Sequence, residues 1–342
     1  MTSTSNGLKG LLPSGLRRRL GRVRRTLTGA PATPVTGTTA ANVPATKRAE
    51  GIPVGRSLPP AERLEFRRAR VFETASREGT ILEIGAAHNG TFPKREGYRT
   101  SIVDHLDRDG LVEKYSGFAQ YSADDIEVVD YVLSDGVSLT EAIPDRFDLV
   151  YASHVVEHST SLIHFLEECT ELLAPGGVLS LVVPDKRYTF DRFRERVALG
   201  RVIDTYVSRP AVHTLGTLTE FAVSAVKHRG TTSWVAGHRG EYTFLNDLER
   251  AKEIGASAHS GHYVDVHNWV FSPHHMRLLL HDLADLGYLS VREAYFHETV
   301  GHEFFLNLTR ESPGSGLTRE QLVLLADHEL TSMEIPVFED PT

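Results

Sequence analysis

The residues with the most informative chemistry follow an apolar run near residue 80. Residues 81–84 read Ile-Leu-Glu-Ile, Gly85 follows at once, and a second apolar run ends at Asp104. A glycine after a strand lets the backbone approach a ligand closely, and an acid at the tip of the next strand can accept hydrogen bonds from both ribose hydroxyls. The pattern predicts a site for an adenosine-containing cofactor at the carboxyl edge of a parallel sheet.

The glycine spacing decides between cofactors. A dinucleotide site favours G-x-G-x-x-G, which seats the pyrophosphate on a helix N-terminus. Here Ala87 stands at the second glycine position, and the next glycine is Gly90. Glu83 would repel a pyrophosphate but suits a cationic amino group. The sequence therefore favours a nucleoside that carries an amino acid, and it disfavours an NAD-dependent oxidoreductase or epimerase, as does the absence of a Tyr-x-x-x-Lys pair.

Strand-sized and helix-sized apolar patterns alternate along the chain, which indicates βαβ units and a parallel sheet. Strands are predicted at 80–84, 99–104, 127–133, 147–152, 178–183, 289–296 and 302–309, and helices at 61–78, 161–173, 273–286 and 318–330. Five segments follow from these patterns: a basic N-terminal segment and linker (1–60), a cofactor-binding core (61–190), a mostly helical cap (191–272), the completion of the core (273–312) and a C-terminal helix with an acidic tail (313–342).

Charge is distributed unevenly along the 342 residues. Residues 1–60 hold ten Lys or Arg and one acid, whereas the remainder holds 27 bases and 44 acids. An acidic body argues against a nucleic-acid partner. The single cysteine, Cys169, excludes a disulfide scaffold. We expect a cytoplasmic protein; peripheral contact of the basic, leucine-containing segment 8–27 with a membrane stays open, as does the oligomeric state.

Several motifs together resemble a known family. They are the run at 82–85, Asp104, Asp135-Gly136, the strand at 147–150 that leads into Ser-His-Val-Val-Glu-His at 153–158, and Leu-Leu-Ala-Pro-Gly-Gly at 172–177. Over about residues 75–310 the chain resembles a class I S-adenosylmethionine-dependent methyltransferase. Residues 152–158 and 183–191 resemble, more narrowly, a bacterial subgroup associated with glycan and polysaccharide biosynthesis. The resemblance implies a doubly wound, mostly parallel α/β sheet of seven strands with a Rossmann-like topology, whose last two strands form an antiparallel hairpin.

The resemblance also implies which residues bind the cofactor, S-adenosyl-L-methionine. Glu83 and Gly85 should lie at its methionine end, and Asp104 should hold the ribose. Asp135 and Gly136 should contact the adenine. Ser153 and His154 should lie beside the sulfonium. The complete set of expected cofactor-binding residues is Glu83, Gly85, Ala86, Asn89, Asp104, Asp135, Gly136 and Ser153.

A hydroxyl acceptor needs a base that takes its proton during attack, and histidine suits this role near neutral pH. The motif favours His154, and His267 is the second candidate. Asp185 is a carboxylate alternative. His158 is more simply explained as a local pair or cap at the start of a helix.

Two further clusters contain side chains that could bind a ligand. His262, Asp265 and His267 could present three ligands to an ion, but two imidazoles suit zinc or manganese better than magnesium. Hydrogen bonding to substrate or base catalysis explains them better, so no metal is predicted. Asp185, Lys186 and Arg187 follow a strand at the cofactor edge, where the two cations could bind an anionic group of the substrate.

The resemblance implies a transferase of the EC 2.1.1 type that O-methylates a hydroxyl of a saccharide or glycan-linked intermediate. An N- or C-methyltransferase of a small metabolite or lipid precursor is the alternative. A third hypothesis is a non-catalytic scaffold that keeps the methyltransferase fold.

Overall fold

The computed structural model describes residues 58–118, 122–134, 136–238 and 240–331. The predictions for the basic segment 8–27, for the linker that follows it and for Asp135 concern residues outside these ranges. Within them, no helix combines the length and the apolar character needed to cross a membrane.

One mixed sheet of seven strands organises the described chain, in the order β3-β2-β1-β4-β5-β9-β8. The strands are β1 (Thr80–Ile84), β2 (Arg99–Asp104), β3 (Tyr131–Val132), β4 (Phe147–Ser153), β5 (Leu173–Pro184), β8 (Arg292–Val300) and β9 (Glu303–Thr309). The first five are parallel, and β9 runs antiparallel to both β5 and β8. The predicted fold class, including the terminal hairpin, is confirmed.

Strand β3 is shorter than the predicted 127–133. The side chain of Asp130 accepts a hydrogen bond from the backbone nitrogen of Ile102 at 2.7 Å and so occupies a donor of β2 that a longer β3 would use. Glu127 accepts from the backbone nitrogens of Lys94 and Arg95 at 2.7 and 3.1 Å. Backbone pairing with β2 begins at Asp130, whose nitrogen donates to the carbonyl of Ile102 at 2.9 Å, and the side-chain bonds of Glu127 hold the chain before that point.

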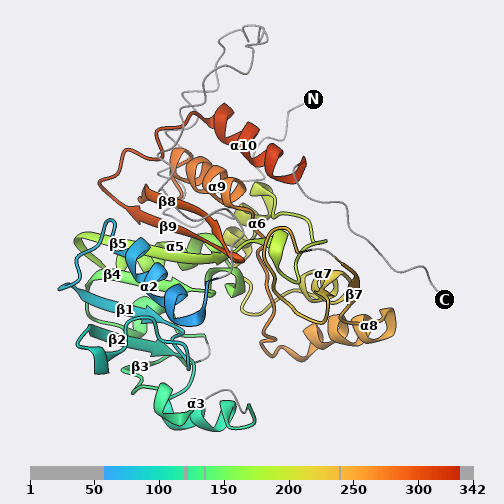
Figure 1. Ribbon diagram of the computed structural model, residues 1–342, viewed down its shortest axis with the longest axis horizontal. Coiled ribbons are helices and arrows are strands. Elements are labelled where there is room, and N and C mark those ends of the chain that lie inside the picture. Colours follow the sequence, from blue (N-terminus) through green and yellow to red (C-terminus); the bar gives the residue numbers. More distant parts are fainter. Residues whose placement is uncertain (1–57, 119–121, 135, 239, 332–342) are drawn as a thin grey trace, which may run out of the picture. The chain divides into compact units, whose positions relative to one another are not determined.

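The two faces of the sheet bury alternate residues of the same strands, as the two-residue period of a strand requires. One face carries Ile81, Leu149, Val182 and Phe305 and packs on helix α2 (Pro60–Val71). The other carries Leu82, Val150, Leu181 and Leu306 and packs on α5 (Leu162–Glu171) and α9 (Pro273–Asp285). Figure 1 shows α2 and α5 on opposite sides of the sheet. Because both faces are covered, the central strands are mostly apolar, and Glu83 in β1 is a buried exception.

The remaining helices are α3 (Arg108–Tyr115), α4 (Leu139–Ala142), α6 (Leu199–Ser208), α7 (Leu215–Ser224), α8 (Leu248–Ala256) and α10 (Arg319–Thr331). Three of them, α6 to α8, lie between β5 and α9 in the chain, together with a small hairpin of β6 (Val226–His228) and β7 (Tyr242–Phe244) that the sequence did not predict. Figure 1 shows α7, α8 and β7 gathered beside the sheet. The domain boundaries drawn from the sequence stay predictions.

The connection from β1 to β2 contains a single 3₁₀ turn, Lys94–Glu96, and no α-helix. Phe92 is completely buried there, and its ring contacts the rings of Phe72, Tyr98 and Tyr151 at centroid distances of 5.0–5.4 Å. Aromatic packing therefore holds this loop on the sheet where a helix would otherwise do so.

Replacement of Phe92 by alanine should lower the free energy of unfolding by about 3–5 kcal/mol, because a large buried ring is removed. Phe118→Ala, which removes a ring that is 51% exposed, should cost less than about 1 kcal/mol. Urea unfolding of both variants measures the difference. Equal effects of the two substitutions would show that Phe92 does not hold the loop.

Candidate functional site

The loop after β1 has the sharp backbone turn that the sequence predicts. Gly85 has a φ of +67°, and its nitrogen donates to the carbonyl of Val103 at 2.9 Å. A Cβ at Gly85 would lie 3.2 Å from the side chain of Val155, so the loops after β1 and β4 meet here. Ala87 has a φ of +43°, a left-handed conformation that costs a non-glycine residue about 1–2 kcal/mol. The turn therefore keeps its shape although alanine stands where the resemblance implies glycine.

Glu83 is buried and stabilises the far end of this loop. Its carboxylate accepts hydrogen bonds from the backbone nitrogens of Thr91 at 2.6 Å and Phe92 at 3.1 Å. Burial raises the pKa of Glu83 to about 7, although the two amides act to lower it. The side chain thus has a structural role that the sequence analysis did not foresee, next to its predicted place at the cofactor.

Asp104 ends β2 and is also buried. Its Oδ2 accepts from the nitrogen of Ala87 at 3.2 Å, while Oδ1 accepts from the nitrogen of His105 at 2.8 Å and lies 2.6 Å from Nδ1 of the same histidine. The acid at the strand tip therefore contacts the glycine loop directly. This is the position from which an acid can reach a ribose.

A cavity of about 330 Å³ opens between α2 and the loop. Three of the predicted cofactor-binding residues line it, namely Glu83, Ala86 and Asn89, together with Arg63 and Arg67 from α2. The volume lies within the range of small-molecule sites. Glu83 offers a carboxylate and Arg63 a guanidinium, which suit the ammonium and carboxylate of an amino-acid group. The lining does not include Asp104, Gly136 or Ser153; Gly136 lies in a turn after β3 with a φ of +79°.

His154 follows β4 directly and has a strained backbone, with a φ of +54°. Its Nε2 lies 3.0 Å from Oε2 of Glu303, which forms a two-point ion pair with Arg67 at 2.6 and 2.9 Å. Although burial acts to raise the pKa of Glu303, Arg67 and His154 lower it far below its usual range. Strained residues cluster at functional sites. The predicted base is therefore oriented by a buried carboxylate.

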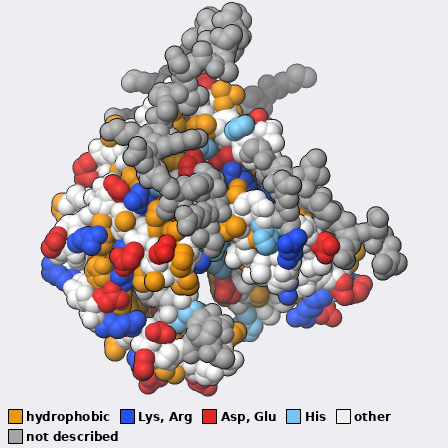
Figure 2. Space-filling view, viewed as in Figure 1, with side chains coloured by type: hydrophobic (Ala, Val, Ile, Leu, Met, Phe, Trp, Pro, Cys, Tyr) orange, Lys and Arg blue, Asp and Glu red, His pale blue; other side chains and the backbone are white. Residues whose placement is uncertain are grey.

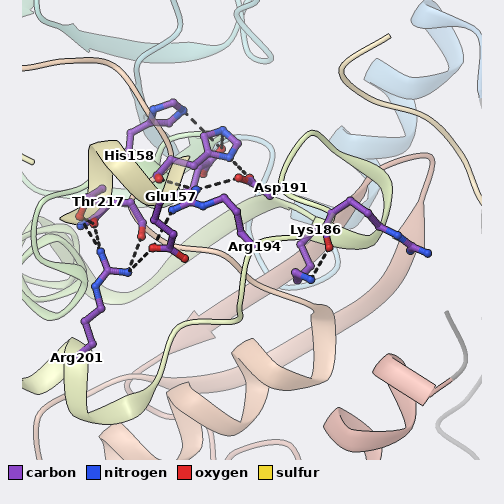
Figure 3. Close-up of polar contacts among 11 residues, drawn as sticks. Glu157, His158, Lys186, Asp191, Arg194, Arg201 and Thr217 are labelled. Carbon is purple, nitrogen blue, oxygen red and sulfur yellow. Dashed lines mark hydrogen bonds and ion pairs between the residues drawn. The ribbon is translucent and has the colours of Figure 1, made fainter. Parts of the chain in front are cut away.

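Beside His154 lies a second histidine group around Glu157, whose side chain is fully buried (Figure 3). Its Oε1 lies 3.7 Å from Nδ1 of His154, 3.9 Å from Nε2 of His158 and 3.8 Å from Nε2 of His267. Histidine side chains also border a hollow on the face of the molecule seen in Figure 2. The structure thus brings both predicted base candidates, His154 and His267, to one carboxylate.

His267 and His158 each lie next to an aspartate. Nδ1 of His267 lies 2.5 Å from Oδ2 of Asp191, and Nδ1 of His158 lies 2.8 Å from Oδ1 of Asp265. Burial acts to lower the pKa of His158, but Asp265 and Glu157 raise it overall. His158 is therefore more than a helix cap. His262 is exposed, so the three-residue set that includes it is not assembled.

The predicted substrate-binding residues Asp185, Lys186 and Arg187 are buried and bound internally. Arg187 donates to both carboxylate oxygens of Asp185 at 2.7–3.0 Å, and Nζ of Lys186 donates to the carbonyl of Arg192 at 2.9 Å. Burial lowers the pKa of Lys186 to about 8. Since the charged groups of Asp185 and Arg187 are committed to each other, this segment is better described as part of the fold than as an anion site or a base.

Glu303, Asp191 and Arg67 are the site residues that sequence reasoning missed. Glu303 faces the carboxyl end of β5 through its pairing with Pro184 in the antiparallel ladder. Asp191 lies in the motif at 183–191 but reaches His267 across 76 residues of chain. The family resemblance at 183–191 pointed to the segment that contains Asp191, but it assigned no role to this residue.

Replacement of Glu83 by glutamine should lower the free energy of unfolding by about 1–3 kcal/mol, because the amide nitrogen would face one of two backbone donors. The effect should depend on pH. Since the folded-state pKa is raised from 4.5 to about 7, the stability that Glu83 contributes is full below its unfolded pKa and is lost as the pH rises through 7. Urea unfolding should therefore show a larger loss near pH 5 than near pH 8.

The exposed Glu113→Gln is the matched control, and neither its stability nor the pH profile should change. A loss in Glu83→Gln that grows with pH would show that the ionised carboxylate, and not the protonated form, dominates in the folded chain.

Comparison with known proteins gives the family. A model described as a methyltransferase domain matches residues 60–283. Two curated proteins named ubiquinone biosynthesis O-methyltransferase are similar: one from Chelativorans sp. is 33% identical over 101 residues, 27% of this chain and 38% of that protein. The other, from Nitrobacter winogradskyi, is 28% identical over 155 residues, 44% of this chain and 46% of that protein. The matched part thus spans less than half the length of these relatives.

Among solved structures, the PH0226 protein from Pyrococcus horikoshii is 13% identical with a TM-score of 0.38, over 74% of this chain and 92% of that one. The mitomycin 7-O-methyltransferase MmcR is 14% identical with a TM-score of 0.35, over 73% of this chain and 53% of that one. Because the family model covers most of the described chain, this protein belongs to the methyltransferase domain family, whose methyl donor is S-adenosyl-L-methionine.

Proposed function

We propose that this chain transfers the methyl group of S-adenosyl-L-methionine to a hydroxyl of a polar acceptor, of which a saccharide or glycan-linked intermediate is the favoured class. One observation carries the proposal. His154, at the end of β4, lies 3.0 Å from the buried Glu303, and the chain next to it contacts the glycine loop at Gly85. A base oriented by a carboxylate is what a hydroxyl acceptor requires.

When bound, the cofactor supplies a methyl group that is already activated by its sulfonium, so the chain mainly aligns the reactants and excludes water. Glu83 and Arg63 would hold its amino-acid group, and Asp104 would accept hydrogen bonds from its ribose. His154 takes the hydroxyl proton as the acceptor attacks. Glu303 stabilises the resulting imidazolium, and Arg67 keeps Glu303 ionised.

The names of the curated relatives support transfer to oxygen, since both are O-methyltransferases. The saccharide class rests on the resemblance at 152–158 and 183–191 and on the polar surroundings of His154. Tyr263 adds an aromatic ring that is 49% exposed, with its hydroxyl 3.3 Å from the carbonyl of His158. Such a ring can stack on the apolar face of a sugar.

Loss of Asp104 should weaken cofactor binding. In Asp104→Ala, the affinity for S-adenosylhomocysteine should fall about 10- to 100-fold, because hydrogen bonds to a charged acceptor contribute about 1.5–3 kcal/mol. Isothermal titration calorimetry measures this. Asp109→Ala, in α3, removes an exposed acid of the same type and should leave the affinity unchanged. Unaltered binding in Asp104→Ala would remove this residue from the cofactor site.

Loss of His154 should impair turnover and spare cofactor binding. In His154→Ala we expect kcat to fall by about 10²-fold or more, with the affinity for S-adenosylhomocysteine within about threefold of wild type. His302→Ala, which removes a neighbouring ring at 5.8 Å, is the control and should stay within a few-fold of wild type. Transfer of a labelled methyl group to candidate sugars gives the rates.

Three outcomes would contradict the proposal. Full activity in His154→Ala would show that another group is the base. Methylation of amines but not of hydroxyl acceptors would support the N-methyltransferase alternative. Binding of S-adenosylhomocysteine without transfer to any acceptor would support a scaffold that keeps the fold.

A further inference from the structure

Glu157 is a buried carboxylate that lacks hydrogen-bond partners in the described part of the chain. Its side chain is fully buried, and neither carboxylate oxygen has a hydrogen-bond partner among the described residues. Its surroundings contain imidazole nitrogens at 3.7–3.9 Å, which is beyond hydrogen-bond distance. A buried carboxylate in this condition costs several kcal/mol unless a cation compensates it.

The imidazoles next to Glu157 are oriented in the way that metal-binding histidines are. His158 and His267 both present Nε2 to Glu157. Nδ1 of His267 is hydrogen-bonded to Asp191, and Nδ1 of His158 lies 2.8 Å from a carboxylate oxygen of Asp265 at ion-pair distance. Metal-ligating histidines almost always place their second nitrogen on a carboxylate or carbonyl, which fixes the ring and the tautomer. Here both histidines have such a partner.

The support extends one step further on the His267 side. Arg194 donates to Oδ1 of Asp191 at 2.9 Å and to the backbone carbonyl of His267 at 2.8 Å (Figure 3). The backbone carbonyl of Glu157 accepts from the nitrogens of Asn268 and Trp269 at 2.7 and 3.0 Å. These bonds fix the segment at 267–269 against the turn that carries Glu157 and His158. The three side chains are therefore positioned before any ligand binds.

We propose that Glu157, His158 and His267 bind one divalent transition-metal ion. One ligand atom of each residue lies within 4.8 Å of the others, so a small inward movement of the side chains brings all three to coordination distance. Two imidazole nitrogens and one carboxylate oxygen suit Mn²⁺, Fe²⁺ or Zn²⁺ better than Mg²⁺, which prefers oxygen ligands. Three protein ligands leave positions open for an acceptor. Asp265, a possible metal ligand by sequence, lies at Nδ1 of His158 and would orient that ring rather than bind the ion.

Two other groups of comparable composition are less suitable. In the group of His154, His302 and Glu303, the carboxylate is already neutralised by Arg67. In the group of His274, Glu298 and Glu329, the carboxylate of Glu329 accepts from Ser272 and from the nitrogen of His274. An Arg277 nitrogen also lies 3.0 Å from His274 there. In both groups an arginine contacts a would-be ligand side chain directly, whereas Arg194 contacts Asp191 and the backbone carbonyl of His267 and none of the three proposed ligand side chains.

An ion at this site would lie next to His154 and could take part in methyl transfer. This catalytic role rests on the proposed function. Nδ1 of His154 lies 3.7 Å from Oε1 of Glu157. An acceptor hydroxyl bound to the ion would have a lowered pKa and would lie near the base. Metal binding itself does not depend on this step.

The test is metal binding by the full chain after treatment with a chelator. Calorimetric titration with MnCl₂ and with ZnCl₂ should show one site per chain, and bound Mn²⁺ should change its electron paramagnetic resonance signal. His158→Ala, His267→Ala and Glu157→Gln should each weaken binding at least about 100-fold. Asp191→Asn and Asp265→Asn should weaken it about 10- to 100-fold, because they remove only the orienting carboxylate.

His281→Ala is the matched control. Its Nδ1 also lies near an aspartate, Asp282, at 3.3 Å, but it belongs to α9, and the affinity should be unchanged. Circular dichroism checks the fold of each variant. If substitutions of the buried residues prevent folding, Asp265→Asn still tests the metal site. The side chain of Asp265 is 71% exposed, so its replacement should not disturb the fold.

Absence of binding by the wild type would overturn the inference, and so would binding that persists in Asp265→Asn and in either histidine variant. The two proposals fail separately. Methyl transfer by a chain that binds no metal overturns the metal site alone, whereas metal binding by a chain that transfers no methyl group overturns the proposed function alone.

Discussion

The buried ion pair between Arg67 and Glu303 is the interaction on which the arrangement of the site depends. It joins α2 to the first residue of β9, and Glu303 in turn binds His154 after β4. Three segments that are far apart in the chain are thereby fixed at one edge of the sheet. Removal of one partner would leave an uncompensated buried charge, which typically costs about 3–5 kcal/mol. The pair therefore couples the stability of the fold to the orientation of the histidine.

A second constraint comes from the register of the sheet. The backbone nitrogen of His154 donates to the carbonyl of Val182 at 2.9 Å, and Pro184 is opposite Glu303. The parallel pairing of β4 with β5 and the antiparallel pairing of β5 with β9 thus bring residues 154 and 303 together. The left-handed backbone at His154 then turns its ring toward the carboxylate. The site is a consequence of strand order as much as of the residues that compose it.

Much of the fold could be predicted from local pattern, because buried strands such as 80–84 and 99–104 are apolar runs bounded by turn residues. The start of the strand predicted at 127–133 could not, because the side chain of Asp130 accepts from the backbone nitrogen of Ile102 and takes a donor that an earlier start would need. At the site, Glu83 lies near the end of β1, Asp104 ends β2 and His154 follows β4, so their places at the sheet edge were predictable from the strand pattern. Glu303 and Asp191 were not predictable from local sequence. Glu303 pairs with His154, 149 residues away, and Asp191 pairs with His267, 76 residues away. The predicted anion-binding role of Lys186 and Arg187 was wrong, because the sequence does not show that these two adjacent cations are buried and bound internally.

The missing helix between β1 and β2 has an electrostatic consequence. A helix that starts at a glycine loop directs its positive end at the ligand and favours phosphate groups. Here the loop leads instead to the packed aromatic rings around Phe92, so no helix begins at the glycine loop, and the helix whose first residue, Pro60, lines the cavity is α2. The positive helix end nearest the cavity therefore comes from a segment that precedes β1 in the chain, and not from the crossover that follows it.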